Sequence, residues 1–189
     1  MQDKLFVPAQ SLLIDSFKLA KKIMDSGYKP NFIVAIWRGG TPVGMAIQEF
    51  FSYHNIEADH IAIKTSAYGK EIDTMKRKIT VDGIGYIVKK CNSDDRLLII
   101  DDVYDTGLSI NEVIKKIKQK SRKNTPQIKV ATVYYKPTRN KTDTAPEFYI
   151  HETEKWIVFP HELEGLTAEE ISRKGLDIEK YLDNNLAKK

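Results

Sequence analysis

The stretch RLLIIDDVYDTGLSI, residues 96–110, joins an apolar run to a cluster of three aspartates. Five mostly apolar residues, typical of a buried strand, lead into Asp101 and Asp102, and Asp105 follows three positions later, directly before Thr-Gly. Carboxylates this close together repel one another, so their charged forms need a cation or a hydroxyl-rich ligand nearby. The stretch therefore predicts a binding site at the end of a strand.

The segments around this stretch alternate between strand and helix. Apolar runs predict strands at 32–37, 58–65, 96–100 and 128–135. Helical spacing of apolar residues predicts helices that include residues 13–24, 45–53 and 109–120. This order favours an α/β domain whose mainly parallel, twisted sheet is flanked by helices.

Helical spacing also predicts which side chains are buried. In the first helix the expected face is Leu13, Phe17, Ala20 and Met24, and in the third it is Ile110, Val113, Ile114 and Ile117. Residues 66–82 are polar, of mixed charge and without a sustained period, so we expect a long mobile excursion there.

The C-terminal part differs from the rest of the chain. Two short strand-like pieces precede a helix that Thr167 and Glu170 open with a capping box. We expect the chain, residues 1–189, to form a single domain. Its core would cover about residues 1–136, and a small C-terminal hood would cover about residues 137–189.

The composition is that of an ordinary globular protein, with 41% hydrophobic and 30% charged residues. A net charge of +4 suits an anionic small molecule at least as well as a nucleic acid. The single cysteine, Cys91, excludes an internal disulfide framework and a cysteine-based zinc site. No apolar run approaches the roughly 18 residues of a membrane span, and no secretory signal is visible, so we expect a cytoplasmic protein.

The residues after the aspartates suit a phosphate group. In an open parallel sheet, ligands bind beyond the carboxyl ends of the strands. The segment DTGLS, 105–109, leads into a helix, so it offers free backbone N–H groups, the flexibility of Gly107 and two hydroxyl groups around one point. Carboxylates for sugar hydroxyl groups or magnesium, next to a phosphate cradle, indicate a phosphorylated sugar as ligand.

The complete pattern of apolar strand, two acidic residues, two apolar residues and Asp-Thr-Gly-x-Ser resembles the phosphoribosyl-pyrophosphate motif of the type I phosphoribosyltransferases. The resemblance implies a magnesium-dependent transferase in which Asp101 and Asp102 hold Mg²⁺ and Asp105 is the catalytic acid or base. It assigns phosphoribosyl pyrophosphate to Asp101, Asp102, Asp105, Thr106, Gly107, Leu108 and Ser109.

Two further segments resemble the same family. AIWRGGTPVG, 35–44, is similar to its pyrophosphate loop: Arg38 would supply charge, and Gly39 and Gly40 would let the backbone approach the diphosphate. The family often has a cis peptide in this loop, which here would be Trp37–Arg38. TSAYGKE, 65–71, is similar to its mobile loop, which implies that Ser66 and Tyr68 also contact phosphoribosyl pyrophosphate and exclude water.

A third pair of segments, YYKPTRN and EKWIVFPHE, resembles the bacterial 6-oxopurine enzymes, especially the xanthine–guanine type. The resemblance implies that Lys136 donates to the purine 6-oxo group, Trp156 stacks on the ring, Ile157 contacts the base through its backbone, and Glu162 is the acidic residue that follows. A cation favours a carbonyl-bearing base over adenine, and an indole is a flat platform for a purine.

The chain departs from the pattern at three positions: Tyr104 replaces an aliphatic residue, Leu108 a glycine or basic residue, and His161 a tryptophan. The last two leave the preference among xanthine, guanine and hypoxanthine open. One alternative is a regulatory protein that senses phosphoribosyl pyrophosphate and binds nucleic acid, which the scattered basic residues disfavour. Another is a phosphoribosyltransferase for a different base. The resemblance also implies a homo-oligomer, a dimer or a tetramer.

Overall fold

The computed structural model describes residues 3–68, 78–175 and 178–182, and for Ala67, Tyr68, Lys78 and Glu179 only the backbone. The chain forms two compact units, a larger one of residues Leu13–Glu154 and a smaller one that combines Met1–Leu12 with Lys155–Lys189. The sequence placed the start of the C-terminal hood near residue 137, whereas the smaller unit starts its second segment at Lys155. The difference arises because residues 148–152 pair with the main sheet.

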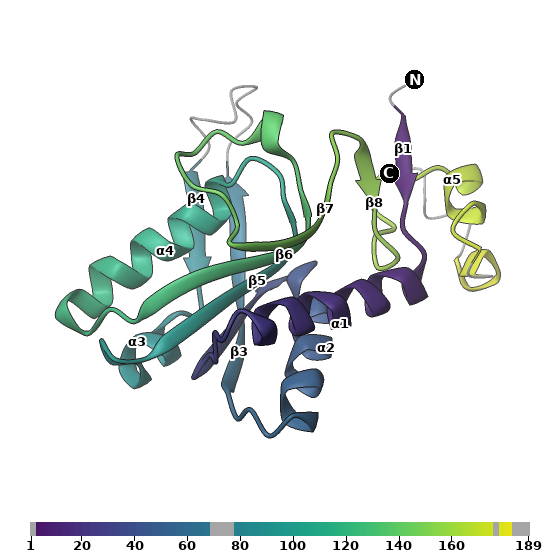
Figure 1. Ribbon diagram of the computed structural model, residues 1–189. Helices are drawn as coiled ribbons and strands as arrows, with labels where there is room; N and C mark the ends of the chain where they lie inside the picture. Colours follow the sequence, from purple (N-terminus) through teal and green to yellow (C-terminus); the bar gives the residue numbers. More distant parts are fainter. Residues whose placement is uncertain (1–2, 69–77, 176–177, 183–189) are drawn as a thin grey trace. The chain divides into compact units, whose positions relative to one another are not determined.

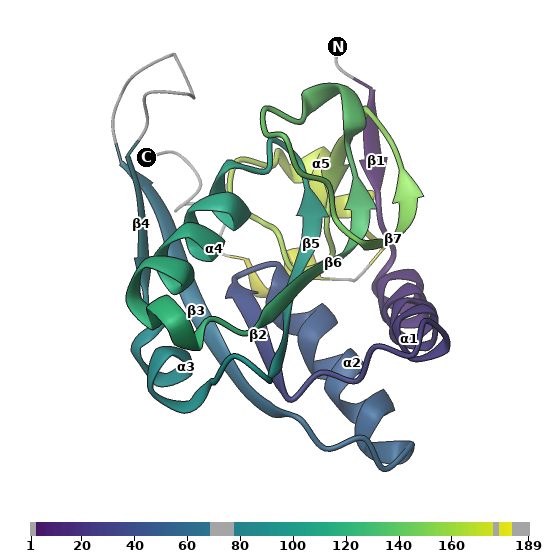
Figure 2. The same ribbon diagram turned by 60° about the vertical axis from the view of Figure 1, so that its left-hand side comes forward.

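The larger unit is built on a six-stranded sheet with the order β4-β3-β2-β5-β6-β7 (Figure 2). Its strands are β2 (Phe32–Trp37), β3 (Asp59–Tyr68), β4 (Lys78–Asp82), β5 (Arg96–Tyr104), β6 (Gln127–Tyr135) and β7 (Phe148–Glu152). The only antiparallel pair among these is β3 with β4, and every other neighbouring pair is parallel. The predicted α/β class with a mainly parallel sheet is confirmed.

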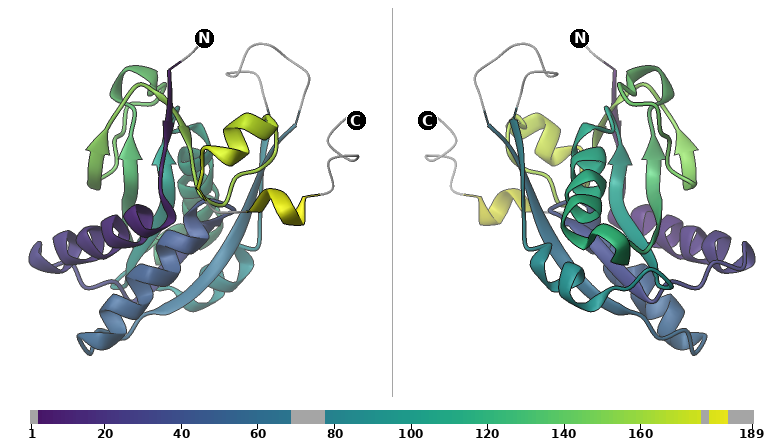
Figure 3. Two further views of the ribbon diagram at one scale, coloured as in Figure 1. Left: turned by 90° about the vertical axis from the view of Figure 1, so that its right-hand side faces the viewer. Right: turned by 90° about the vertical axis from the view of Figure 1, so that its left-hand side faces the viewer.

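Helices cover both faces of this sheet. Figure 3 shows α1 and α2 on one face and α3 and α4 on the other. Their bounds are α1 (Ala9–Asp25), α2 (Gly40–Tyr53), α3 (Gly85–Lys90) and α4 (Leu108–Ser121), and the short 3₁₀ helices are η2 (Arg122–Asn124) and η3 (Pro137–Arg139). Alternate side chains of β2 serve the two faces: Val34 and Ile36 pack with Ile117 of α4 in one cluster, while Ile33 is buried outside that cluster. Burial on both faces explains the continuous apolar run of β2.

The α4 face is as predicted, with Ile110, Val113 and Ile117 buried and Ile114 packed against the same cluster. It positions the helix directly after the aspartates, with its N-terminus at the carboxyl end of β5. Strand β5 is longer than the apolar segment 96–100 that predicted it, and it ends at Tyr104.

The predicted buried face of α1 is wrong at Leu13 and Phe17, which are 48% and 38% exposed, whereas Ala20 is buried as predicted. The helix also buries Leu12, Ser16, Leu19 and Ile23. The sequence offers two overlapping apolar stripes, and a polar contact selects between them: the buried Asp15 lies 2.7 Å from His151 Nε2 in β7. Although burial alone would raise the pKa of Asp15, its hydrogen bonds with Lys18 and His151 lower it below the ordinary value.

The expected excursion over residues 66–82 is wrong at both of its ends. Residues 66–68 complete β3 and residues 78–82 form β4, with Ser66 opposite Thr80 in an antiparallel ladder. The strands show no clear period in the sequence because β4 is an edge strand and Val81 is its only buried residue among those described. Residues 69–77 lie outside the described part of the chain.

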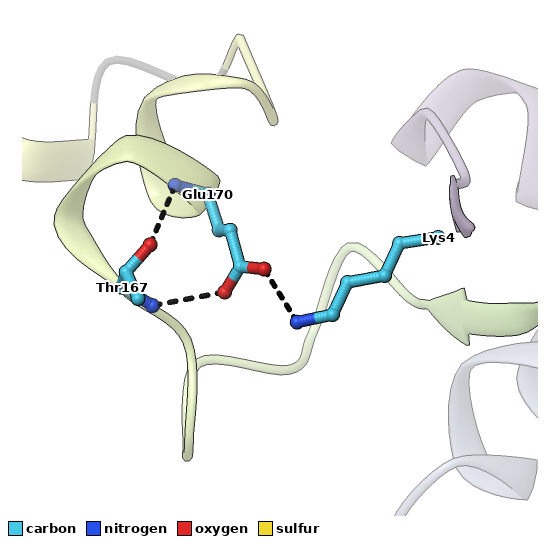
Figure 4. Close-up of polar contacts among 3 residues, drawn as sticks. All are labelled: Lys4, Thr167 and Glu170. Carbon is cyan, nitrogen blue, oxygen red and sulfur yellow. Dashed lines mark hydrogen bonds and ion pairs between the residues drawn. The ribbon is translucent and has the colours of Figure 1, made fainter. Parts of the chain in front are cut away.

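The smaller unit contains a second, two-stranded parallel sheet of β1 (Lys4–Phe6) and β8 (Trp156–Val158) (Figure 1). It also contains α5 (Ala168–Ser172) and η4 (Ile178–Tyr181). The predicted capping box is confirmed: Glu170 N–H donates to Thr167 Oγ1 at 3.3 Å, and Thr167 N–H donates to Glu170 Oε2 at 3.0 Å. Lys4 donates to the other oxygen of Glu170, which joins β1 to α5 (Figure 4).

None of the helices in the described ranges has both the length and the apolar character that crossing a bilayer requires.

Candidate active site

The first two aspartates lie within β5 and not beyond it. Asp101 is opposite Thr132 of β6, and the ladder with β6 continues to Tyr104. On its other side β5 pairs with β2 only as far as Ile100. The edge beyond Ile100 is occupied by the turn that follows β2, so this turn and the aspartates form one continuous surface.

The two glycines of that turn are explained by their contacts with β5. A Cβ on Gly39 would lie 2.0 Å from Asp102 Oδ2, and a Cβ on Gly40 would lie 2.4 Å from the Ile100 carbonyl oxygen. The sequence predicts that these glycines let the backbone approach a diphosphate. In the structure, both positions need glycine because any side chain there would collide with β5. The Trp37–Arg38 peptide is cis, as expected, and the Arg38 side chain is exposed.

The neighbouring carboxylates of Asp101 and Asp102 favour the binding of a cation. Burial and, next, the charge of Asp102 raise the pKa of Asp101 well above its ordinary value, although N–H groups of Asp102 and Gly40 partly oppose the shift. Asp102 is itself only 7% exposed. Asp101 is half-buried, and two such neighbouring carboxylates are stabilised by any cation that joins them. This pair therefore suits a divalent ion.

The donor set fits magnesium held together with a substrate. Within the described ranges, no three His, Cys, Asp or Glu side chains are grouped closely enough to hold a metal ion by themselves. Magnesium is commonly bound by one or two carboxylates and completed by substrate phosphate oxygens and water. Asp101 and Asp102 would be the protein ligands in such a complex.

The residues predicted to form a phosphate cradle lie at the N-terminus of α4. A cavity of about 90 Å³ lies there, lined by Asp101, Val103, Tyr104, Asp105, Thr106, Gly107, Ser109 and Ile110. Gly107 is the N-cap residue with a φ of 76°, and no described side chain caps this helix end. Uncapped N–H groups and the positive end of the helix dipole favour an anion in this cavity.

Tyr104 forms the floor of the cradle, which accounts for its departure from the family pattern. It is 1% exposed, and a Cβ on Gly107 would lie 2.5 Å from its ring. Its hydroxyl group lies 3.0 Å from Oγ1 of Thr142 and 3.0 Å from Oγ1 of Thr144. The tyrosine therefore ties the cradle to the loop after η3.

Asp105, the first residue after β5, faces two cations. Lys136 Nζ lies 3.5 Å from its Oδ2, and Arg139 Nε lies 2.8 Å from its Oδ1. Lys136 is 3% exposed, an unusual degree of burial for a lysine, which marks it as a candidate functional group. The structure thus brings Asp105, the expected acid or base, close to Lys136, which is expected to donate to the purine.

Arg139 was missed by the sequence reasoning. Its signal is the spacing in KPTR: residues three apart in a 3₁₀ helix lie on the same side, and η3 covers residues 137–139. The Arg139 N–H donates to the Lys136 carbonyl oxygen at 3.2 Å, which fixes this turn.

The other predicted residues fall in different places. Ser66 lies in β3, and the Tyr68 side chain is outside the described part of the chain. Trp156, Ile157 and Glu162 belong to the smaller unit. There Trp156 is 46% exposed and Ile157 is buried, while Glu162 Oε2 accepts the Phe159 N–H at 3.0 Å and so stabilises its own turn.

Comparisons with known proteins agree with this geometry. The family model described as "Phosphoribosyl transferase domain" matches residues 7–165. The chain therefore belongs to the phosphoribosyltransferase family, in its type I fold, and this membership implies a pentosyltransferase. No curated protein matches the sequence significantly.

Solved structures of this fold include purine enzymes. The purine phosphoribosyltransferase of Pyrococcus horikoshii has 28% identity, a TM-score of 0.66, and coverage of 87% of this chain and 98% of that chain. A hypothetical protein from Neisseria gonorrhoeae with bound ppGpp has 20% identity, a TM-score of 0.69 and coverage of 99% and 97%. The Helicobacter pylori xanthine-guanine-hypoxanthine phosphoribosyltransferase has 19% identity, a TM-score of 0.61 and coverage of 84% and 92%.

Proposed function

We propose that this protein transfers the 5-phosphoribosyl group of phosphoribosyl pyrophosphate to N9 of a 6-oxopurine: xanthine, guanine or hypoxanthine. The bond between the anomeric carbon and the pyrophosphate oxygen breaks, and the pyrophosphate leaves with the electron pair. The bond from the anomeric carbon to N9 forms, and the base loses one proton. The observation that supports this proposal most is the carboxylate surface of β5 next to an uncapped helix N-terminus.

Phosphoribosyl pyrophosphate would lie along this surface. The backbone of residues 106–109 would hold its 5′-phosphate, while Asp101 and Asp102 would bind the ribose hydroxyl groups, directly or through the metal. Arg38, Gly39, Gly40, Ser66 and Tyr68 would contact the diphosphate or close over it, as the resemblance implies. Fixing the sugar at its phosphate end holds the anomeric carbon in place while it reacts. Bound magnesium would stabilise the negative charge of the departing pyrophosphate.

The base would be recognised by its 6-oxo group. Lys136 would donate to that oxygen, and Asp105 would take a proton at N7. Trp156, Ile157 and Glu162 remain the proposed base-binding residues of the smaller unit. The buried ammonium group of Lys136 supports an oxygen acceptor, because an adenine amino group would meet it as a second donor. This feature favours a 6-oxopurine over adenine.

One assay tests the proposal. The purified protein is supplied with phosphoribosyl pyrophosphate, magnesium and one base at a time, and nucleotide formation is followed by absorbance. We expect turnover with at least one 6-oxopurine and at least tenfold slower turnover with adenine or orotate. Turnover with orotate or adenine alone would contradict the substrate assignment and favour a transferase for another base.

The alternative of a regulatory protein makes a different prediction. A protein that senses phosphoribosyl pyrophosphate and reads nucleic acid would bind RNA or DNA with a steep dependence on salt concentration. We expect filter binding to detect no such complex at physiological salt. We also propose that the protein is a dimer or a tetramer, as the resemblance implies, and light scattering of the purified protein tests this.

A further inference from the structure

The carboxylate of Asp105 is held at its two oxygens by two different cations. Arg139 Nε lies 2.8 Å from Oδ1, and Lys136 Nζ lies 3.5 Å from Oδ2. Oδ1 is itself buried, whereas the side chain as a whole is 34% exposed. An incoming base therefore reaches this carboxylate through Oδ2.

The contact at Oδ1 is an ion pair and not a well-directed hydrogen bond. The distance from Arg139 Nε is short, yet Oδ1 has no hydrogen-bond partner of acceptable geometry. An arginine carries its charge at any accessible pH, so this attraction persists whatever the neighbouring groups do. The guanidinium group thus fixes one oxygen and leaves the other available.

Lys136 is not suited to hold Asp105 during the reaction. Its distance of 3.5 Å from Oδ2 is at the outer limit of a hydrogen bond. Under the proposed function its ammonium group donates to the purine oxygen, so its attraction to Oδ2 weakens as the base binds. Of the two cations paired with Asp105 in the described structure, Arg139 is then the one that remains committed to it.

Other charges around this group are balanced. Glu154 Oε1 accepts the Thr138 N–H at 3.1 Å, and this bond, together with the charges of Lys136 and Arg139, lowers the pKa of Glu154. Its negative charge therefore faces the same two cations from the end of β7. Asp105 and Glu154 thus carry two negative charges near the two positive charges of Lys136 and Arg139.

We infer that Arg139 is the positioning residue of the active site, which fixes Oδ1 of Asp105 while Oδ2 accepts the N7 proton of the purine. The inference rests on the proposed function. As N9 bonds to the anomeric carbon, the N7 proton moves to Oδ2, the base becomes neutral, and pyrophosphate departs with its electron pair. Arg139 stays charged throughout and touches no reacting atom.

The test is a double-mutant cycle on kcat with the base that the wild-type protein uses best. We expect Arg139→Gln to lower kcat about tenfold to a hundredfold, with the KM for phosphoribosyl pyrophosphate changed less than threefold. Because Arg139 acts through Asp105, its loss should be smaller than that of Asp105→Asn, and it should have no further effect in the Asp105→Asn background.

Two variants separate position from charge. Arg139→Lys keeps the cation without the planar group and should recover part of the loss. Arg96→Gln removes the same charge at the opposite end of β5 and should leave kcat within twofold of wild type.

The outcomes distinguish this inference from the function beneath it. Absence of wild-type turnover with every base overturns both. Wild-type turnover with an unaffected Arg139→Gln variant overturns the inference alone. Full additivity of the two substitutions also overturns the inference, since it would mean that Arg139 acts independently of Asp105.

Discussion

At the scale of single residues, the site contains one carboxylate, Asp101, whose charged form is disfavoured without a ligand. Burial and the neighbouring charge of Asp102 raise the pKa of Asp101, so the folded protein holds a proton there more tightly than the unfolded chain does. Sites of this kind trade stability for binding, because a group arranged for a ligand is under strain without it. Asp101 is therefore expected to destabilise the ligand-free protein.

Asp101→Asn tests whether this carboxylate destabilises the ligand-free protein. Because the folded-state pKa of Asp101 is raised, its contribution to wild-type stability is greatest in acid and falls as the pH rises from the ordinary carboxyl range through the raised pKa. The variant lacks this loss, so at pH 8 it should melt higher by about 2–4 °C for each kcal/mol of charge penalty removed. Thermal melts of both proteins across pH would show the difference vanishing in acid. A difference that is the same at every pH would refute the explanation.

Asp105→Asn tests the catalytic assignment. An amide cannot accept the N7 proton, so kcat with a 6-oxopurine should fall by about 10²- to 10⁴-fold. Binding of phosphoribosyl pyrophosphate, measured separately, should be nearly retained. Asp94→Asn, which changes an exposed carboxylate just before β5, is the matched control. Wild-type kcat in Asp105→Asn would remove the assigned role.

At the scale of elements, the phosphate cradle depends on a junction between β5, α4 and the loop after η3. Tyr104 connects all three through its ring beneath Gly107 and its hydroxyl bonds to Thr142 and Thr144. A second link is the Lys141 N–H, which donates to the Thr106 carbonyl oxygen at 3.0 Å. These contacts fix the backbone whose N–H groups would bind the 5′-phosphate.

Tyr104→Phe should loosen this junction. Loss of its hydroxyl bonds should cost about 1 kcal/mol, or roughly 2–4 °C in Tm. The KM for phosphoribosyl pyrophosphate should rise several-fold, with kcat nearly unchanged. Tyr28→Phe is the control, because the Tyr28 hydroxyl group bonds Leu97 and Gln127 carbonyl oxygens at the other end of the sheet. Equal KM changes in both variants would contradict a local role for Tyr104.

Some of these elements could be predicted from the sequence, and others could not. Strands β2 and β5 could be predicted because burial on both faces gives continuous apolar runs. The DTGLS turn could be predicted because Gly107 readily adopts the positive φ that the turn needs. The buried face of α1 could not be predicted from the sequence, because a contact between Asp15 and the distant His151 selects it. Arg139 was also missed, because only the fold brings it to Asp105 from 34 positions away.

At the scale of the whole molecule, the larger unit contains every group proposed to bind phosphoribosyl pyrophosphate. The smaller unit contains Trp156, whose ring is half-exposed. Under the proposed function, the sugar phosphate would bind to the larger unit and Trp156 would take part in the choice of base. Substitutions in the smaller unit should accordingly change the preference among bases more than the affinity for phosphoribosyl pyrophosphate.

Isothermal titration calorimetry of phosphoribosyl pyrophosphate into the purified protein with magnesium tests the central claim most directly. The account predicts saturable binding with one site per chain, lost when Asp101 and Asp102 are both replaced by Asn. Absence of any binding heat across a range of temperatures, or unchanged affinity in the double variant, would contradict it.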